Sequence, residues 1–229
     1  MKNRFWVRVK RSYERNAPSA AKVSFTGGFG GDYDLKKVAM KLLILAHVPP
    51  PHDPPTPVKW MLDAWTGPGT PAIQCFHVNA PDPQAGGCPF PGALWAGVLA
   101  LWYRFRYGVT NLYYVPSSGG WSGLKRDWLV LRLCRPFFQR IIFHWQTPGL
   151  SRWLELTTNN PTLLRTYQRM GNVDLAILDS EFNRRDAEKL TPKQLKIIPC
   201  GGAKAGDKLA TAPYLAAVAA ALHDVGIPD

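Results

Sequence analysis

The sequence LLILAHV, residues 42–48, decides the fold. It is apolar at every position except His47 and has the length of a strand. Near-continuous apolar runs of this length are typical of parallel strands that are buried on both faces. Because both faces of such a strand need a covering layer, the sequence predicts an α/β domain.

Outward from this strand, short apolar runs alternate with longer segments that have helical spacing. Pro57 stands at a favourable first helical position, and Ser180 is a natural N-cap for the segment after it. Strands separated by helices imply parallel crossovers and an open sheet. We therefore predict a Rossmann-like open parallel sheet with helices on both faces over residues 40–201. The predicted strands are 42–48, 72–79, 111–116, 140–145, 173–180 and 195–199, and the predicted helices are 57–65, 92–107, 123–134 and 181–190.

The two ends of the chain differ from this pattern. Residues 1–39 are basic and carry no sustained period, so we expect a weakly ordered extension and take Met40 as a hypothetical start of translation. Residues 202–229 predict a linker and a terminal helix, with Thr211 as its cap, Pro213 in its first turn and Gly226 beyond its end.

The formal net charge is +12, which favours anionic partners such as nucleic acid, acidic lipid head groups or phosphorylated small molecules. No apolar stretch approaches the roughly 18 residues of a membrane span. The basic N-terminus is not followed by the apolar stretch of about 7–15 residues that marks a secretory signal. The four cysteines, Cys75, Cys88, Cys134 and Cys200, are far apart and form no CxxC pair, so we expect a reducing compartment without disulfides or a zinc site.

Ligands of open parallel sheets bind outside the carboxyl ends of the strands. Three segments should lie there: the loop after the first strand, the loop VPSSGGWSG (115–123), and the turn after His144. That turn opens a helix, whose amino end favours phosphate or carboxylate. The candidate binding residues of these segments are His47, His52, Ser118, Gly119, Gly120, Thr147 and Gly149.

Plainer interpretations stay open for each segment. A lone histidine at a strand end is commonly a packed residue, and SSGGWSG has neither the ending of a P-loop nor GxGxxG spacing. WYRFRY and RPFFQR interleave basic and aromatic residues as nucleic-acid-binding proteins do, but no nucleic-acid-binding motif accompanies them.

Taken in order, five segments resemble the N-terminal, acceptor-side domain of family 4 glycosyltransferases, which have the GT-B fold. They are KLLILAHVPPPH, WYRFRYGVTNLYYVP, RDWLVLRLCRPFFQRIIFHWQTPGLSRWLE, VDLAILDSEFNRRDAEKL and KIIPCG, and they cover nearly all of residues 41–201. The resemblance implies retaining transfer of a sugar from a nucleotide-sugar donor, which is a substrate, so that neither a cofactor nor a metal is expected. It also implies that His144 is the catalytic residue in the cleft and that Ser180 and Glu181 border the cleft.

In the family a second domain holds the donor nucleotide, and residues 202–229 are too few to form one. We therefore expect a truncated transferase that is inactive alone and needs a donor domain from a separate polypeptide. Its expected substrates are a nucleotide sugar and a glycan or lipid-linked acceptor, in surface polysaccharide biosynthesis. The expected location is the cytoplasm, with peripheral contact to the inner membrane face through residues 92–107 and 123–138. The alternatives are a non-catalytic remnant or binding module, and a basic nucleic-acid-binding protein.

Overall fold

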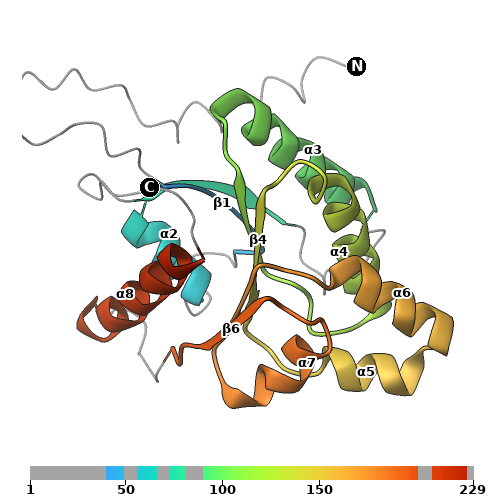
Figure 1. Ribbon diagram of the computed structural model, residues 1–229. Helices are drawn as coiled ribbons and strands as arrows, with labels where there is room; N and C mark the ends of the chain where they lie inside the picture. The colour runs from blue at the N-terminus through green and yellow to red at the C-terminus, as the bar shows by residue number, and fades with distance from the viewer. Residues whose placement is uncertain (1–39, 49–55, 66–72, 81–89, 201–207, 226–229) are drawn as a thin grey trace, which may run out of the picture. The chain divides into compact units, whose positions relative to one another are not determined.

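Six parallel strands form one open sheet in the computed structural model, which describes residues 40–48, 56–65, 73–80, 90–200 and 208–225 (Figure 1). The order across the sheet is β2-β1-β3-β4-β5-β6. The predicted α/β class, with an open parallel sheet, is confirmed. The strands are β1 Met40–Ala46, β2 Ile73–Asn79, β3 Asn111–Tyr114, β4 Arg140–Trp145, β5 Leu175–Leu178 and β6 Gln194–Ile197.

The chain reverses its direction of travel across the sheet once. It runs outward from β1 to the edge strand β2, passes back over β1 to β3, and then continues strand by strand to β6. β1 therefore lies between β2 and β3 and pairs with both. The carboxyl ends of β1 and β3 meet at the point where the strand order reverses, which is where open α/β sheets bind ligands.

Helices cover both faces of the sheet, as expected. The helix α2 (Pro57–Trp65) and the terminal helix α8 (Lys208–Asp224) pack with one set of buried side chains. The opposite set is covered by α3 (Phe90–Tyr107), α4 (Trp121–Cys134), α5 (Leu150–Thr157), α6 (Asn160–Met170) and α7 (Arg184–Glu188). Since parallel crossovers are right-handed, reversing the direction of travel after β2 moves the next helix to the other face.

The strand β1 shows why the apolar run of the sequence is nearly continuous. Leu43 and Leu45 point into the core under α3 and α4, whereas Leu42 and Ile44 point into the core under α2 and α8. All four side chains are fully buried. Successive side chains of a strand point to opposite faces, so a strand covered on both sides has to be apolar at every position.

The structure differs from the expected elements in three places. The helix α6 was not expected, and it begins after Asn159, whose side chain accepts a hydrogen bond from the Thr162 backbone N–H. The expected helix over 181–190 is a short 3₁₀ turn, Glu181–Asn183, followed by the single-turn α7, and Ser180 makes no capping bond. Thr211 is not a cap and Pro213 is not in the first turn, because α8 begins earlier, at Lys208.

Residues 1–39 and Gly226 lie outside the described residues, whereas α8 packs on the domain and buries Tyr214 and Val218. Within the described ranges, no helix combines the length and the apolarity that crossing a bilayer would require.

Gly171 joins α6 to the segment before β5 and leaves no room for a side chain. A Cβ atom there would collide with the backbone oxygen of Tyr167 and lie 3.1 Å from that of Leu190. Backbone atoms cannot move aside as a flexible side chain can, so we expect Gly171→Ala to destabilise the fold by about 3 kcal/mol. The control is Gly108→Ala, whose Cβ meets nothing within 4 Å but whose φ of +68° should cost about 1 kcal/mol. Chemical denaturation measures both, and a smaller loss for Gly171→Ala would contradict the packing.

Candidate functional site

The carboxyl edge of the sheet gathers most of the predicted site residues. His47 follows β1, Ser118 to Gly120 follow β3, Thr147 and Gly149 follow β4, and Ser180 and Glu181 follow β5. His52 lies outside the described residues. The loops after β3 and β4 approach each other closely, because a Cβ built on Gly149 would lie 3.6 Å from the Ser118 carbonyl oxygen.

Asp179 and Tyr214 hold the His144 side chain in place at this edge. Its Nε2 lies 2.6 Å from Oδ1 of Asp179, which directly follows β5. The Tyr214 hydroxyl of α8 lies 3.3 Å from the same nitrogen and donates to Asp179 Oδ1 at 3.5 Å. The Tyr113 ring packs edge-on against the imidazole. His144 is fully buried, so the histidine that the sequence places at the strand end is covered rather than open to solvent.

The protonation pattern of this cluster follows from its partners. An ionised carboxylate only accepts hydrogen bonds, so the pairing with Asp179 assigns the proton of a neutral His144 ring to Nε2. Burial, followed by the nearby Asp179 charge, raises the pKa of the Tyr214 hydroxyl well above its usual value. That hydroxyl therefore stays a donor. With Nε2 occupied, the lone pair at Nδ1 is the position of the imidazole that remains for a ligand.

Three successive residues at the end of β4, His144, Trp145 and Gln146, each have a buried side-chain polar atom without a hydrogen-bond partner. His144 Nδ1 and Gln146 Nε2 each form no hydrogen bond with the protein. Leaving a buried donor or acceptor unsatisfied costs about 1–3 kcal/mol. The first atom is an acceptor in this tautomer and the second is a donor, and a hydroxyl group can pair with either kind of atom because it both donates and accepts.

The loop after β3 is held by a second buried carboxylate. Asp127 of α4 accepts hydrogen bonds from the Tyr114 hydroxyl at 2.6 Å, and from the backbone N–H and Oγ of Ser117 at 2.8 and 2.7 Å. Its ion pair with Arg126 measures 2.9 Å, and both side chains are buried. These bonds fix the start of the loop that carries Ser118, Gly119 and Gly120.

Glycine is required where this loop turns toward α4. Gly119 and Gly120 have φ values of +148° and +87°, which L side chains rarely adopt. A Cβ on Gly119 would also lie 3.3 Å from the Trp153 ring. The two glycines are thus explained by the turn and by the close approach of α5, without a ligand.

A third carboxylate occupies the amino end of α5. Asp186 of α7 accepts hydrogen bonds from the backbone N–H groups of Gly149, Leu150 and Ser151 at 2.6, 3.2 and 2.8 Å. The sequence favours an external phosphate or carboxylate at this helix end, but an internal carboxylate already satisfies these donors. An incoming anion would have to displace Asp186.

The remaining predicted residues make local contacts. His47 Nδ1 lies 3.3 Å from the carbonyl oxygen of Ala80, beyond β2. Glu181 is exposed and forms an ion pair with Arg184. No hydrogen bond joins either residue to His144 within the described part of the chain, so the structure does not bring all the predicted residues into one cluster.

Sequence reasoning missed the residues that organise the edge: Asp127, Asp179, Asp186 and Tyr214. Asp179 carries a signal, because it ends the apolar run of β5 at the same edge as His144. Tyr214 is the single aromatic residue of an alanine-rich helix. Asp127 and Asp186 are indistinguishable in sequence from solvent-exposed helix residues.

Metal and thiol chemistry find little support in the described residues. They contain no group of three His, Cys, Asp or Glu side chains that could hold a metal ion. Cys75, Cys134 and Cys200 are free, and burial raises the pKa of the Cys75 and Cys134 thiols to about 12. Thiols with so high a pKa stay protonated and are weak nucleophiles.

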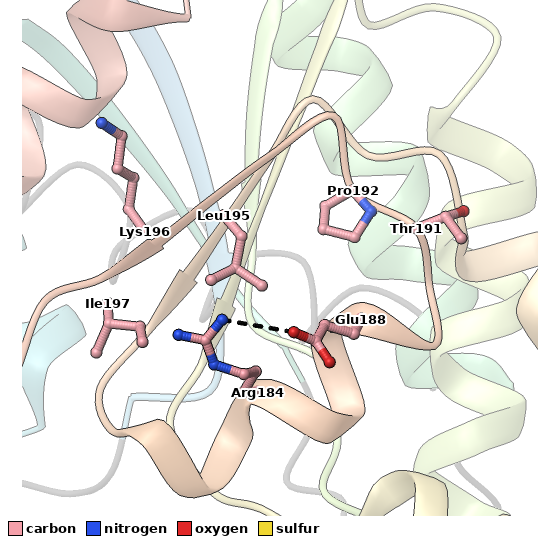
Figure 2. Close-up of a pocket in the computed structure, with 7 residues that line it drawn as sticks. All are labelled: Arg184, Glu188, Thr191, Pro192, Leu195, Lys196 and Ile197. Carbon is pink, nitrogen blue, oxygen red and sulfur yellow. Dashed lines mark hydrogen bonds and ion pairs between the residues drawn. The ribbon is translucent and has the colours of Figure 1, made fainter.

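An open pocket lies away from this site, beside the edge strand β6. Figure 2 shows its lining, with Arg184 and Glu188 of α7 joined by an ion pair and facing Leu195 of β6. The other lining residues are Thr191, Pro192, Lys196 and Ile197. None of the predicted site residues lines it.

The comparisons with known proteins do not identify a family for this chain. No family model matches the chain, and a search of curated proteins gives no match. By its fold and site, the described part of the chain is an open α/β domain with a His–Asp pair at the carboxyl edge of its sheet.

Removing the Asp127 charge should unfold the β3 loop and weaken the domain. Asp127→Asn leaves the buried Arg126 guanidinium without its carboxylate, and breaking one partner of a buried ion pair costs about 3 kcal/mol or more. The control is Glu188→Gln, which removes a carboxylate from an exposed ion pair and should leave the melting temperature unchanged. Equal melting temperatures for the two variants would contradict the buried network.

Removing Asp186 should create the anion site that the native chain fills. Asp186→Ala frees three backbone donors at the start of α5 and should cost about 1–2 kcal/mol, as the loss of a helix cap does. Added phosphate should then raise the melting temperature of the variant more than that of the native protein. The control is Asp63→Ala, which removes an exposed carboxylate of α2 and changes the net charge by the same amount. An equal response to phosphate in all three proteins would refute the displacement.

Proposed function

We propose that this chain is the acceptor-side domain of a retaining glycosyltransferase of the GT-B fold, resembling family 4. It takes part in transferring a sugar from a nucleotide-sugar donor to a glycan or lipid-linked acceptor in surface polysaccharide biosynthesis. Two things support the proposal: the resemblance over residues 41–201 and the Rossmann-like parallel sheet, whose carboxyl edge carries the histidine of that resemblance.

The observation that carries the proposal is the His144–Asp179 pair. A carboxylate at 2.6 Å fixes the imidazole ring, and the opposite nitrogen is buried without a partner. A hydroxyl group can satisfy an acceptor such as this nitrogen or a donor such as Gln146 Nε2, and hydroxyls are the groups that sugars present in greatest number. The pair is thus suited to hold a sugar rather than a purely apolar or purely anionic ligand.

In the proposed reaction His144 orients a hydroxyl and does not form a covalent bond. The acceptor oxygen bonds to the anomeric carbon while the bond from that carbon to the diphosphate breaks. The nucleoside diphosphate takes the bonding electrons, and the acceptor hydroxyl passes its proton to a phosphate oxygen of this leaving group. Asp179 is a positioning residue in this scheme, because it acts only through the imidazole.

The reaction also needs a site for the nucleotide-sugar donor, and in this proposal the described domain contributes the acceptor side. Work on a lipid-linked acceptor would place the protein at the cytoplasmic face of the membrane. Neither a metal nor a cofactor is part of the proposal, since the nucleotide sugar is itself the source of the transferred group.

One observation favours a second candidate, a non-catalytic binding or remnant domain. The imidazole of His144 is fully buried and contacts Tyr113 and Tyr214, so no ligand reaches it unless the side chains around it move. In this alternative the Asp179–His144–Tyr214 cluster joins α8 to the sheet and has only a structural role.

Calorimetric titration of the full chain with nucleotide sugars and with short glycans separates the two candidates. If the transferase proposal holds, one of these ligands binds, and His144→Ala weakens its Kd at least tenfold. Asp179→Asn should have a smaller effect in the same direction. The control is His223→Ala, which removes an exposed histidine near the end of α8 and should bind as the native chain does.

Two results would reject the transferase proposal. One is the absence of binding by a folded native chain, and the other is an equal Kd for His144→Ala and the native protein. Either result, combined with a lower melting temperature for His144→Ala, would establish the structural role of the cluster.

A further inference from the structure

The helix α3 turns its large apolar side chains toward solvent. Six of them form a continuous stripe along the helix, which we call the α3 outer face: Phe90, Leu94, Trp95, Val98, Trp102 and Phe105. Phe105 is 68% exposed and Trp95 is 54% exposed. At about 100° per residue these positions cover one side of the helix, so they form a patch rather than scattered exposures.

The buried side of α3 consists of small residues. Ala93, Ala96, Gly97 and Ala100 face the core, and a Cβ on Gly97 would lie only 2.8 Å from the Leu133 side chain of α4. Figure 1 shows α3 and α4 side by side on the same side of the sheet. The fully buried side of α3 is therefore made of small residues, which lets the helix approach α4 closely and leaves the large side chains of the outer face partly exposed.

The outer face continues beyond α3 and is bordered by basic groups. Phe137, which follows α4 and is also exposed, stacks edge-on against Phe105 at 5.6 Å between ring centroids. Arg104 donates a 2.7 Å hydrogen bond to the Phe137 carbonyl oxygen, and the Arg106 guanidinium lies over the Tyr107 ring.

Exposed negative charge is absent from this part of the chain. Asp127 is the only acidic residue between positions 90 and 140, and it is fully buried in its ion pair with Arg126. The basic residues of the same stretch are Arg104, Arg106, Lys125, Arg126, Arg132, Arg135 and Arg140. Arg104 and Arg106 lie on α3 itself, so the charged residues that this helix carries beside its apolar face are both positive.

We propose that the α3 outer face docks the protein on an anionic lipid bilayer. Aromatic side chains on one face of a helix, with arginines beside them, match the boundary between acyl chains and acidic head groups. Juxtamembrane basic residues strengthen such contact through the negative surface potential. A second copy of the chain fits this face less well than an anionic bilayer does, because two copies that each carry a net charge of +12 repel each other. The proposal does not depend on the transferase activity.

Co-sedimentation of the full chain with vesicles tests this surface. The probes are neutral phosphatidylcholine vesicles and the same vesicles with added phosphatidylglycerol. The native chain should bind the anionic vesicles at least tenfold more tightly, and added salt should weaken the binding. The double variant Trp102→Ser/Phe105→Ser should lose at least tenfold in affinity, whereas Trp102→Phe/Phe105→Leu should retain it.

The matched control is Phe182→Ser, which removes an aromatic side chain that is 85% exposed from a segment outside the α3 outer face. It should bind vesicles as the native chain does. Equal losses for the control and the double serine variant would overturn the proposal, as would the absence of vesicle binding by the native chain. A native dimer that the serine substitutions dissociate, without lipid binding, would assign the face to a second copy. Preferential binding of a single-stranded RNA through the same residues would assign it to nucleic acid.

Discussion

The domain depends on one constraint, that β1 is buried on both faces and therefore needs a helical layer on each side. The order β2-β1-β3 meets this constraint, because the chain leaves β1 in one direction and returns over it in the other. Right-handed crossovers then put α2 and α3 on opposite faces. Because of the same reversal, the chain continues to opposite faces of the sheet after β1 and after β3. The carboxyl ends of these two strands mark the place where open α/β sheets bind ligands.

Three buried or nearly buried aspartates organise that edge. Asp127 holds the loop after β3, Asp186 holds the start of α5, and Asp179 holds the His144 ring. Each carboxylate satisfies donors that a bound anion could otherwise use. In the loops after β3, β4 and β5 that the structure describes, these donors are therefore already used, whereas His144 Nδ1 and Gln146 Nε2 are among the buried polar atoms without a partner. This arrangement favours a ligand that presents hydroxyl groups.

Much of the fold follows from local sequence, whereas the site does not. Apolar runs predict β1 and the place of His144, because burial on both faces leaves no other composition for a parallel strand. The helix α6 has a polar sequence, NPTLLRTYQRM, with too few apolar residues to indicate a helix. α8 extends past Thr211 toward its amino end because Lys208, Leu209 and Ala210 are all good helix formers. The pairing of His144 with Asp179 joins residues 35 positions apart, and the contact with Tyr214 joins residues 70 apart. Such contacts depend on how strands and helices pack, which no local pattern encodes.

The tautomer of His144 tests the account most directly, and NMR detection of the imidazole nitrogens measures it. The central claim is that Asp179 holds the proton on Nε2, so that Nδ1 is free to accept a hydroxyl hydrogen. Comparison with His144→Gln assigns the signals among the five histidines of the chain. The account predicts a protonated Nε2 and an unprotonated Nδ1 whose signal shifts when a bound sugar is present. A proton on Nδ1 of a neutral ring, or an Nδ1 signal that a bound sugar leaves unchanged, would contradict it.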